Sequence, residues 1–357
     1  MKKNLHLAPS DYRPQAPQTP DYGIGLVGCG GIALGAHLPA YQQFGYRVVA
    51  CCSPRMDSVV KAQQKYNIPH GSTDLAIVLD NPDVQIVDLA VHATERLPLV
   101  ERIAAAGKHI LSQKPFAMNY DDAARMVEIC DRAGVRLMIN QQARWAPAHR
   151  AIKLLLERGV IGELYSVMHV YRGFQDEPGS WFVSLEDFNI VDHGIHYIDL
   201  SRYFTGQNPI RIKATTVNVP GQVAVSPMIY TINCEYSPNE NGAALMSTLH
   251  FNNIVRASQT HSYIWYLDGT EGSITASQTE LLVSRTDSEE QTVINIEGSW
   301  FPEAFGGSMG EMMLAVHEDR EPTTSGRDNL NAIKIAYAAV ESSNTGEAVS
   351  LLSDVTK

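Results

Sequence analysis

A short apolar run that ends in a glycine-rich turn opens the patterned part of this sequence. Residues 22–27 are typical of a buried β-strand, Gly28 and Gly30 follow directly, and a stretch with helical spacing continues to about Phe44. A strand that leads through a tight turn into a helix is the first half of a βαβ unit, in which crossover helices join parallel strands. The pattern therefore restricts the chain to folds built on a parallel sheet covered by helices.

The same alternation of apolar runs and amphipathic stretches continues as far as residue 139. Strands are predicted at residues 47–52, 84–91, 109–112 and 136–139, and helices at residues 56–66, 97–106 and 120–133. Asn119 is a suitable N-cap for the last helix, and Gly134 is suited to end it. The first part of the chain is thus predicted to be a doubly wound parallel sheet of the Rossmann type.

The composition changes after Trp145. A helix is predicted at residues 147–158, and period-two runs follow at residues 166–171, 211–217, 228–236, 243–251, 262–267 and 281–283. Asn241-Gly242 favours a tight turn before the fourth run, and an Ala-rich helical stretch covers residues 329–342. The second part is therefore an α/β domain with a mainly antiparallel sheet. We expect an arm at residues 1–21, the Rossmann domain at 22–145 and a second domain at 146–357.

Length and charge limit what the chain can do. Its 357 residues exceed what one hydrophobic core usually supports, so two domains are expected. Apolar residues make up 44% and charged residues 19%, as in ordinary globular proteins. The net charge of −11 disfavours binding to a nucleic-acid backbone, which requires a basic surface. Nucleic acid is therefore not an expected partner.

The cysteines indicate a reducing environment. The chain has five of them, Cys29, Cys51, Cys52, Cys130 and Cys234. Their odd number and scattered positions fit neither a disulfide framework nor a zinc site.

No secretory signal and no apolar run of membrane-spanning length is recognised, so we expect a cytoplasmic protein without membrane contact. Two interpretations of the Pro-rich arm stay open, a disordered tail or a strap over a neighbouring subunit.

The glycine turn is suited to bind the pyrophosphate of a dinucleotide. Gly28 allows the tight bend directly after the strand. The backbone amides of Gly30, Gly31 and Ile32 would face the phosphates beside the N-terminus of the following helix. The strand, turn and helix together therefore predict a dinucleotide-binding site, against the alternative of a mere tight turn.

The end of the second strand bears on the choice between NAD and NADP. An NAD-binding chain usually has Asp or Glu there to bind the ribose hydroxyls, but this chain has Ser53. Ser53 does not repel a 2′-phosphate, and Arg55 either pairs with one or is a solvated surface charge. The expected cofactor is NAD(P), with NADP slightly favoured.

Lys114 and residues 192–199 supply the candidate catalytic groups. Lys114 follows an apolar run at the carboxyl end of a predicted parallel strand, and its ammonium would donate to a substrate hydroxyl. If the segment around His196 is helical, Asp192 lies four residues away on the same face. His196 would then take the hydroxyl proton as hydride leaves the same carbon, and Asp192 would orient the substrate or stabilise the imidazolium.

Two neighbouring groups of residues permit a second interpretation. His193, His196 and Asp199 are spaced so that a helix could present them to a metal ion, but no Cys or Glu nearby completes the set, so no metal is expected. Residues 174–188 include Trp181. This side chain would form an aromatic wall over a sugar ring or anchor the loop in the core.

Several motifs taken together resemble the Gfo/Idh/MocA family, the glucose-fructose oxidoreductase and inositol dehydrogenase group. They are residues 28–33, 107–115, 144–147, 162–163, 192–199, 269–272 and 325–328. Their combined order extends over residues 22–352 and is far more specific than any one motif. The resemblance implies a Rossmann domain, a C-terminal α/β domain with a large open sheet, and assembly through that sheet as a dimer or tetramer. It also implies oxidation or reduction of pyranoses or cyclitols with nicotinamide.

The resemblance assigns roles to single residues. Lys114 matches the lysine of the family's Glu-Lys-Pro motif, Asp192 its substrate-binding aspartate and His196 its acid/base. The candidate cofactor residues are then Gly28, Gly30, Gly31, Ile32, Ser53, Arg55, His92, Gln113, Lys114 and Trp145, and the candidate substrate residues are Lys114, Arg144, Trp181, Asp192 and His196.

Three positions depart from the family's pattern. Gln113 stands where the family usually has Glu, Thr94-Glu95 where Thr-Pro is common, and Pro98 replaces a histidine often found at the start of the following helix. These departures leave the three catalytic groups in place. They leave the preference for substrate and cofactor open.

These features predict an NAD(P)-dependent oxidoreductase that moves hydride between a secondary alcohol carbon of a sugar, cyclitol or glycoside and the nicotinamide. An alternative is a glycoside-cleaving enzyme that works by transient oxidation and elimination and regenerates its bound cofactor. A third hypothesis, a noncatalytic cofactor-sensing protein, predicts the loss of one or more of the three catalytic groups. All three are present.

Overall fold

The chain forms two compact units that alternate along the sequence. In the computed structural model, which describes residues 5–238 and 242–352, the Rossmann unit consists of Arg13–Ala146 and Gly298–Ile333. The open-sheet unit consists of Met1–Tyr12, Pro147–Glu297 and Lys334–Lys357. The predicted boundary after residue 145 placed Gly298–Ile333 in the second domain. In the structure this segment belongs to the Rossmann unit, because its helix packs against the Rossmann elements.

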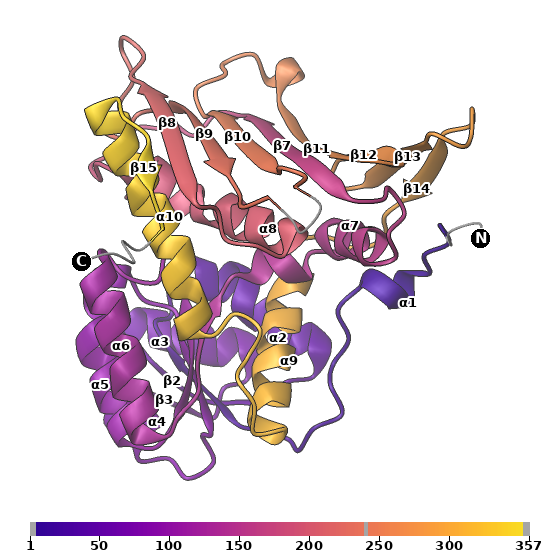
Figure 1. Cartoon of the computed structure of the whole chain (residues 1–357). Coiled ribbons are helices and arrows are strands. Elements are labelled where there is room, and N and C mark those ends of the chain that lie inside the picture. Colours follow the sequence, from indigo (N-terminus) through magenta and orange to yellow (C-terminus); the bar gives the residue numbers. More distant parts are fainter. Residues whose placement is uncertain (1–4, 239–241, 353–357) are drawn as a thin grey trace. The chain divides into compact units, whose positions relative to one another are not determined.

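The Rossmann unit is built on a six-stranded parallel sheet (Figure 1). Its strands are β1 (Ile24–Val27), β2 (Val48–Cys52), β3 (His70–Ser72), β4 (Ile86–Leu89), β5 (His109–Gln113) and β6 (Leu137–Asn140). They run in the order β3-β2-β1-β4-β5-β6, and each neighbouring pair is parallel. The doubly wound prediction is confirmed. Strand β3 was not predicted, because its sequence His-Gly-Ser contains no apolar run.

Helices cover both faces of such a sheet, and most of them follow the predicted pattern. The Rossmann unit contains the π-helix η1 (Ala33–His37), α2 (Leu38–Phe44), α3 (Met56–Tyr66), α4 (Ala76–Leu79), α5 (Arg96–Ala105), α6 (Tyr120–Ala133) and α9 (Glu303–His317), with the 3-10 turns η2 (Ala93–Glu95) and η3 (Gln142–Trp145). The predicted caps of α6 are confirmed. The Asn119 side chain accepts a hydrogen bond from the Asp122 amide at 2.8 Å, and Gly134 ends the helix with a φ of 68°.

The core of the Rossmann unit is packed between the sheet, α2 and α9. Ile24 and Leu26 of β1 are fully buried there, and burial of each such side chain stabilises the fold by about 1.5–3 kcal/mol. Helix α9 was not predicted, because its three glycines interrupt the apolar spacing. In the structure these glycines allow close packing: Gly306 lies against Phe44 of α2.

The open-sheet unit contains a nine-stranded sheet. Its strands are β7 (Leu164–Arg172), β8 (Arg211–Val217), β9 (Ile229–Glu235), β10 (Met246–Asn252), β11 (Ser262–Gly269), β12 (Gly272–Ala276), β13 (Glu280–Arg285), β14 (Thr292–Asn295) and β15 (Val349–Ser350). The order is β14-β13-β12-β11-β7-β10-β9-β8-β15. The pair β7 and β10 is parallel and the other pairs are antiparallel, which confirms the prediction of a mainly antiparallel sheet.

Helices pack against one face of the nine-stranded sheet. They are α7 (Pro147–Glu157), the π-helix η4 (Phe188–His193) and α8 (Ile195–Thr205), while the unit also contains α1 (Pro9–Tyr12), η5 (Ser258–Thr260) and most of α10 (Gly326–Thr345). Burial alternates along β9, as expected for a strand with one covered face. Of the predicted turn before β10, Asn241 lies outside the described residues and Gly242 has a φ of 78°.

The N-terminal arm packs on its own chain. Tyr12 is 1% exposed, and its hydroxyl accepts a hydrogen bond from the Glu297 amide at 3.0 Å. Further along, Arg13 forms an ion pair with Glu303 of α9 at 3.0 Å. At Tyr12 and Arg13 the arm is therefore held by burial, a hydrogen bond and an ion pair, unlike a disordered tail. The strap over a neighbouring subunit stays a prediction.

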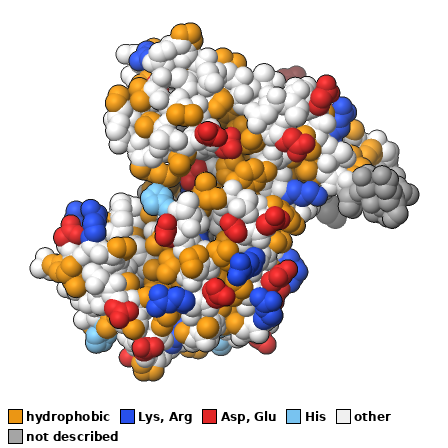
Figure 2. Space-filling model, turned by 90° about the vertical axis from the view of Figure 1, so that its left-hand side faces the viewer, with side chains coloured by type: hydrophobic (Ala, Val, Ile, Leu, Met, Phe, Trp, Pro, Cys, Tyr) orange, Lys and Arg blue, Asp and Glu red, His pale blue; other side chains and the backbone are white. Residues whose placement is uncertain are grey.

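Acidic and basic side chains are interspersed on the face shown in Figure 2. The negative net charge is therefore not gathered into one patch on this face. All five cysteines are buried and form no disulfide. None of the helices within residues 5–238 and 242–352 combines the length and apolar character needed to cross a bilayer.

Candidate functional site

Several candidate residues lie at one edge of the Rossmann sheet. Gly28 directly follows β1, and Ser53 directly follows β2. His92 comes three residues after β4, and Lys114 directly follows β5. Because the strands are parallel, their carboxyl ends share one edge, on both sides of the point between β1 and β4 where the strand order reverses. Doubly wound sheets bind their ligands at this point, so the unit brings these candidates to the expected place.

The glycine turn is tightly packed on one side and open on the other. Gly28 has a φ of 100°, and a Cβ atom there would lie 2.6 Å from the Ala90 carbonyl oxygen. Gly30 and Gly31 are exposed, and no heavy atom lies within 4 Å of the place where their Cβ atoms would be. The open turn at the start of a helix therefore fits a pyrophosphate group, which needs close approach to backbone amides.

A buried polar cluster holds the helix that follows this turn. His37 Nδ1 at the end of η1 lies 2.7 Å from Asp88 Oδ2 in β4, and the Tyr41 hydroxyl donates to the same oxygen at 2.8 Å. Burial and the neighbouring Asp88 raise the pKa of Tyr41 well above its ordinary value, so the hydroxyl remains a donor. Sequence reasoning missed this cluster, although an acid in the middle of a central strand is a usable signal.

The end of β2 bears on the cofactor choice. Ser53 is 8% exposed, and its amide donates to the Ser72 carbonyl at 3.4 Å. Arg55 is the N-cap residue of α3, and its guanidinium donates to the Ser58 hydroxyl at 3.1 Å. Its Nε also lies 4.0 Å from the Asp57 carboxylate, with both side chains exposed. Arg55 is thus beside the N-terminus of a helix, but its charge is partly offset by Asp57.

Two buried amides accompany Lys114 at the end of β5. Gln113 is 6% exposed and pairs in register with Asn140 of β6, which is 1% exposed. Among the described residues, Gln113 Oε1 and both polar side-chain atoms of Asn140 have no hydrogen-bond partner. Buried polar atoms are normally satisfied, so this pair is suited to bind polar groups of a ligand. Sequence reasoning named Gln113 and missed Asn140, which ends an apolar run with an amide.

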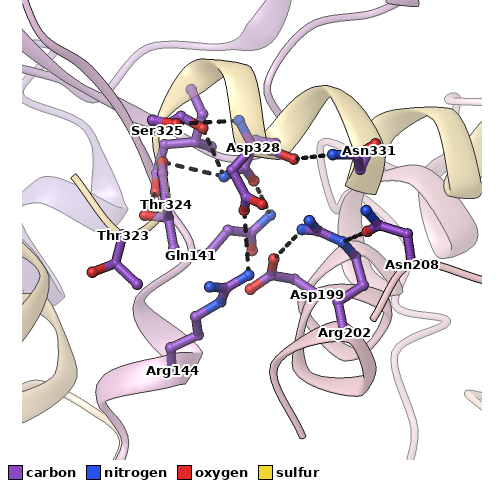
Figure 3. Close-up of polar contacts among 12 residues, drawn as sticks. Gln141, Arg144, Asp199, Arg202, Asn208, Thr323, Thr324, Ser325, Asp328 and Asn331 are labelled. Carbon is purple, nitrogen blue, oxygen red and sulfur yellow. Dashed lines mark hydrogen bonds and ion pairs between the residues drawn. The ribbon is translucent and has the colours of Figure 1, made fainter. Parts of the chain in front are cut away.

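Arg144 and Trp145 lie in the 3-10 turn η3 and have partners within the Rossmann unit. Arg144 Nη2 is 3.5 Å from the Asp328 carboxylate in the first turn of α10 (Figure 3). The Ser325 hydroxyl accepts a hydrogen bond from the Asp328 amide at 3.2 Å and so caps this helix. Trp145 is 8% exposed and packs against Gly307 of α9. Their roles toward substrate and cofactor stay predictions.

Asp192 and His196 lie on either side of a change in helix type. Asp192 belongs to the π-helix η4, and His196 to the first turn of α8, where it is 7% exposed. The Gly194 amide donates to the Asn189 carbonyl five residues earlier at 2.8 Å, whereas the Ile198 amide donates to Gly194 four residues earlier at 3.0 Å. The segment is helical as predicted. Because the hydrogen-bond register changes between Asp192 and His196, their spacing of four residues does not place them on one α-helical face.

Three buried amides and hydroxyls anchor the start of η4. The Asn189 side-chain amide donates to the Pro227 carbonyl at 2.8 Å, and its main-chain amide donates to the Ser226 hydroxyl at 3.1 Å. The Asn253 side chain donates to Asn189 Oδ1 at 3.2 Å. This network fixes the backbone three residues before Asp192, and sequence reasoning did not find it.

Trp181 lies near the start of the same π-helix. Trp181 is 55% exposed, and its ring meets Phe182 and Phe188 edge to face, with centroid distances of 5.8 and 5.4 Å. Phe182 and Phe188 are stacked at 4.2 Å. One side of Trp181 therefore anchors the loop, and more than half of its surface remains accessible.

Two of the residues considered as possible metal ligands, Asp199 and His193, contact other side chains of the protein. Asp199 is fully buried, and its carboxylate lies 3.2 Å from Arg202 Nη1, whose Nε donates to Asn208 at 2.6 Å (Figure 3). The His193 ring packs edge to face on Tyr171 at 5.2 Å. Within the described part of the chain, no three His, Cys, Asp or Glu side chains gather as a metal site requires.

A parallel sheet with an open glycine turn at its reversal point defines a dinucleotide-binding α/β protein. Two family models match the chain: the oxidoreductase family with an NAD-binding Rossmann fold at residues 22–141, and the GFO/IDH/MocA C-terminal domain at residues 149–279. The chain belongs to the Gfo/Idh/MocA family of oxidoreductases. The resemblance inferred from the motifs is thereby confirmed.

Named relatives extend this similarity along most of the chain. D-apiose dehydrogenase of Paraburkholderia graminis is 30% identical over 351 residues, which cover 92% of this chain and 89% of that protein. D-xylose 1-dehydrogenase [NADP(+)] of Haloarcula marismortui is 28% identical and covers 70% of each chain. The crystal structure of an oxidoreductase from Agrobacterium radiobacter in complex with NAD+, L-tartaric acid and magnesium is 25% identical, with a TM-score of 0.82 over 92% of this chain and 98% of that one.

Proposed function

We propose that this enzyme moves hydride between a secondary alcohol carbon of a sugar, cyclitol or glycoside and the nicotinamide of NAD(P). The observation that carries the proposal is the edge of the Rossmann sheet, where the open glycine turn and Lys114 lie at the carboxyl ends of β1 and β5. The similarity to D-apiose dehydrogenase and D-xylose 1-dehydrogenase supports a sugar as the substrate.

Lys114, His196 and Asp192 position the substrate and transfer its proton in this proposal. The Lys114 ammonium donates to the reacting hydroxyl oxygen and favours its deprotonation. His196 accepts the hydroxyl proton, and Asp192 orients the substrate or stabilises the imidazolium. The nicotinamide, when bound, accepts the hydride. Lys114 belongs to the Rossmann unit and the other two residues to the open-sheet unit, so their convergence on one substrate is part of the proposal.

A panel of aldoses, inositols and glycosides, each assayed with NAD+ and with NADP+, tests this function. The panel includes D-apiose and D-xylose, because relatives are named for them. We expect net formation of reduced cofactor with at least one member. If the protein binds the dinucleotide but reduces it with none of them, the proposal fails. Cleavage of a glycoside without net reduction of the cofactor would instead support the elimination mechanism.

Within this function we propose that NADP is preferred over NAD. Ser53→Asp is expected to raise the ratio of kcat/KM for NAD over that for NADP by about tenfold, because a carboxylate binds the ribose hydroxyls and repels a 2′-phosphate. Ser53→Ala is the matched control and should leave the ratio unchanged. An unchanged ratio in Ser53→Asp would show that the end of β2 does not contact the ribose.

We further propose that the enzyme is a homo-oligomer that assembles through the second face of the nine-stranded sheet. Met168, Met246 and Val293 are 38%, 51% and 52% exposed, and the strand registers place all three on the same face. Light scattering should report a dimer or tetramer, and Met168→Glu should shift it toward the monomer, because a buried carboxylate opposes association. A monomeric wild-type enzyme would contradict this.

A further inference from the structure

Arg96 is a fully buried cation beside the loop that carries Lys114. It is the first residue of α5 and is 1% exposed. The other buried residues of α5 are Val100, Ile103 and Ala104, so Arg96 occupies a core-facing position of the helix. A buried guanidinium is costly unless hydrogen bonds satisfy it, so its partners indicate why it is there.

Main-chain carbonyl groups from two loops accept hydrogen bonds from Arg96. Arg96 Nε and Nη2 donate to the Val91 carbonyl, after β4, at 3.0 and 2.8 Å. Nη2 also donates to the Lys114 carbonyl at 3.1 Å. Nη1 donates to the carbonyls of Pro115 and Phe116, the latter at 3.5 Å. One side chain therefore links the end of β4 to three consecutive residues after β5.

We propose that Arg96 is a positioning residue, which fixes the main chain at Lys114 and thereby the place of the lysine ammonium. This inference rests on the proposed function of Lys114. A guanidinium presents its donors in a rigid planar fork, so it can hold several carbonyls in one arrangement, whereas an ammonium is a flexible point charge with three donors. The neighbouring strands β4 and β5 end at the edge where the dinucleotide is expected, so the link acts where the ammonium must be precise.

The test compares Arg96→Met and Arg96→Lys in the full-length enzyme. Because a displacement of about 1 Å can cost about a hundredfold in rate, we expect kcat to fall by about a hundredfold in Arg96→Met and by about tenfold in Arg96→Lys. The dinucleotide should still bind, because the substitution changes no residue of the glycine turn, and the loss in kcat should exceed any loss in dinucleotide affinity. Amide hydrogen exchange should become faster at residues 112–118 and stay unchanged in α6. Arg102→Met, at an exposed position of the same helix, is the control and should change none of these.

A purely structural role makes different predictions. If Arg96→Met lowers only the melting temperature, while kcat and the exchange at residues 112–118 match wild type, the proposal is overturned. If Arg96→Met does not fold, Arg96→Lys decides by the same two measurements. The function of Lys114 is tested separately: retained turnover in Lys114→Ala would reject that function, whereas faster exchange at residues 112–118 would still establish that Arg96 holds the segment.

Discussion

Replacing Lys114 by alanine is expected to lower turnover by about a hundredfold or more while the dinucleotide still binds. The substitution removes the ammonium that follows β5, which we propose donates to the reacting hydroxyl. It leaves the glycine turn after β1 intact, and β4 separates these two strands in the sheet. The measurement is kcat at saturating substrate, together with a fluorescence titration of the dinucleotide. Lys61→Ala, an exposed lysine of α3, is the control and should behave as wild type.

His196→Asn should cause a loss of similar size through a different step. Asparagine fills part of the space of the buried imidazole but cannot act as the base at neutral pH. The variant should therefore lose the rise in rate with pH that a histidine base produces, and Lys114→Ala should retain it. Turnover near the wild-type level in either variant, with a folded protein, would refute the assignment of that residue.

Gly28→Ala is expected to destabilise the fold by about 2–4 kcal/mol and to abolish dinucleotide binding. Two causes add. The backbone at Gly28 has a φ of 100°, which alanine adopts only with strain, and its methyl group would lie 2.6 Å from the Ala90 carbonyl oxygen. This oxygen is main chain beyond β4, so the clash cannot be relieved by a side-chain rotation. Denaturant unfolding and a dinucleotide titration measure the two effects.

Gly30→Ala separates packing from ligand binding. The position is exposed and no heavy atom lies within 4 Å of the new methyl group, so the stability should be close to that of wild type. The methyl group would, however, occupy the space of the pyrophosphate and should weaken dinucleotide affinity by about tenfold or more. Unchanged affinity in Gly30→Ala would show that the phosphates bind elsewhere, and wild-type stability in Gly28→Ala would contradict the packing described for the turn.

Local patterns predicted the elements whose residues carry their own signal. Helix α3 begins and ends at Met56 and Tyr66 as expected, and α6 has the predicted caps at Asn119 and Gly134. Elements without such a signal were missed. Strand β3 has no apolar run, and α9 is interrupted by glycines that become favourable only when Phe44 packs against them.

The sequence alone determined the class of fold and the candidate cofactor turn, because periodicity, capping residues and glycines act on neighbouring residues along the chain. The family came from the resemblance carried by the order of several motifs. Only the tertiary structure decided that Gly298–Ile333 returns to the Rossmann unit, that Asp192 lies in a π-helix and that Arg96 holds the carbonyls around Lys114. These features depend on groups that are distant in sequence, or on the choice between two hydrogen-bond registers. Tertiary packing decides which distant groups meet and which hydrogen-bond register a helix adopts. The spacing of residues along the sequence indicates neither of these outcomes.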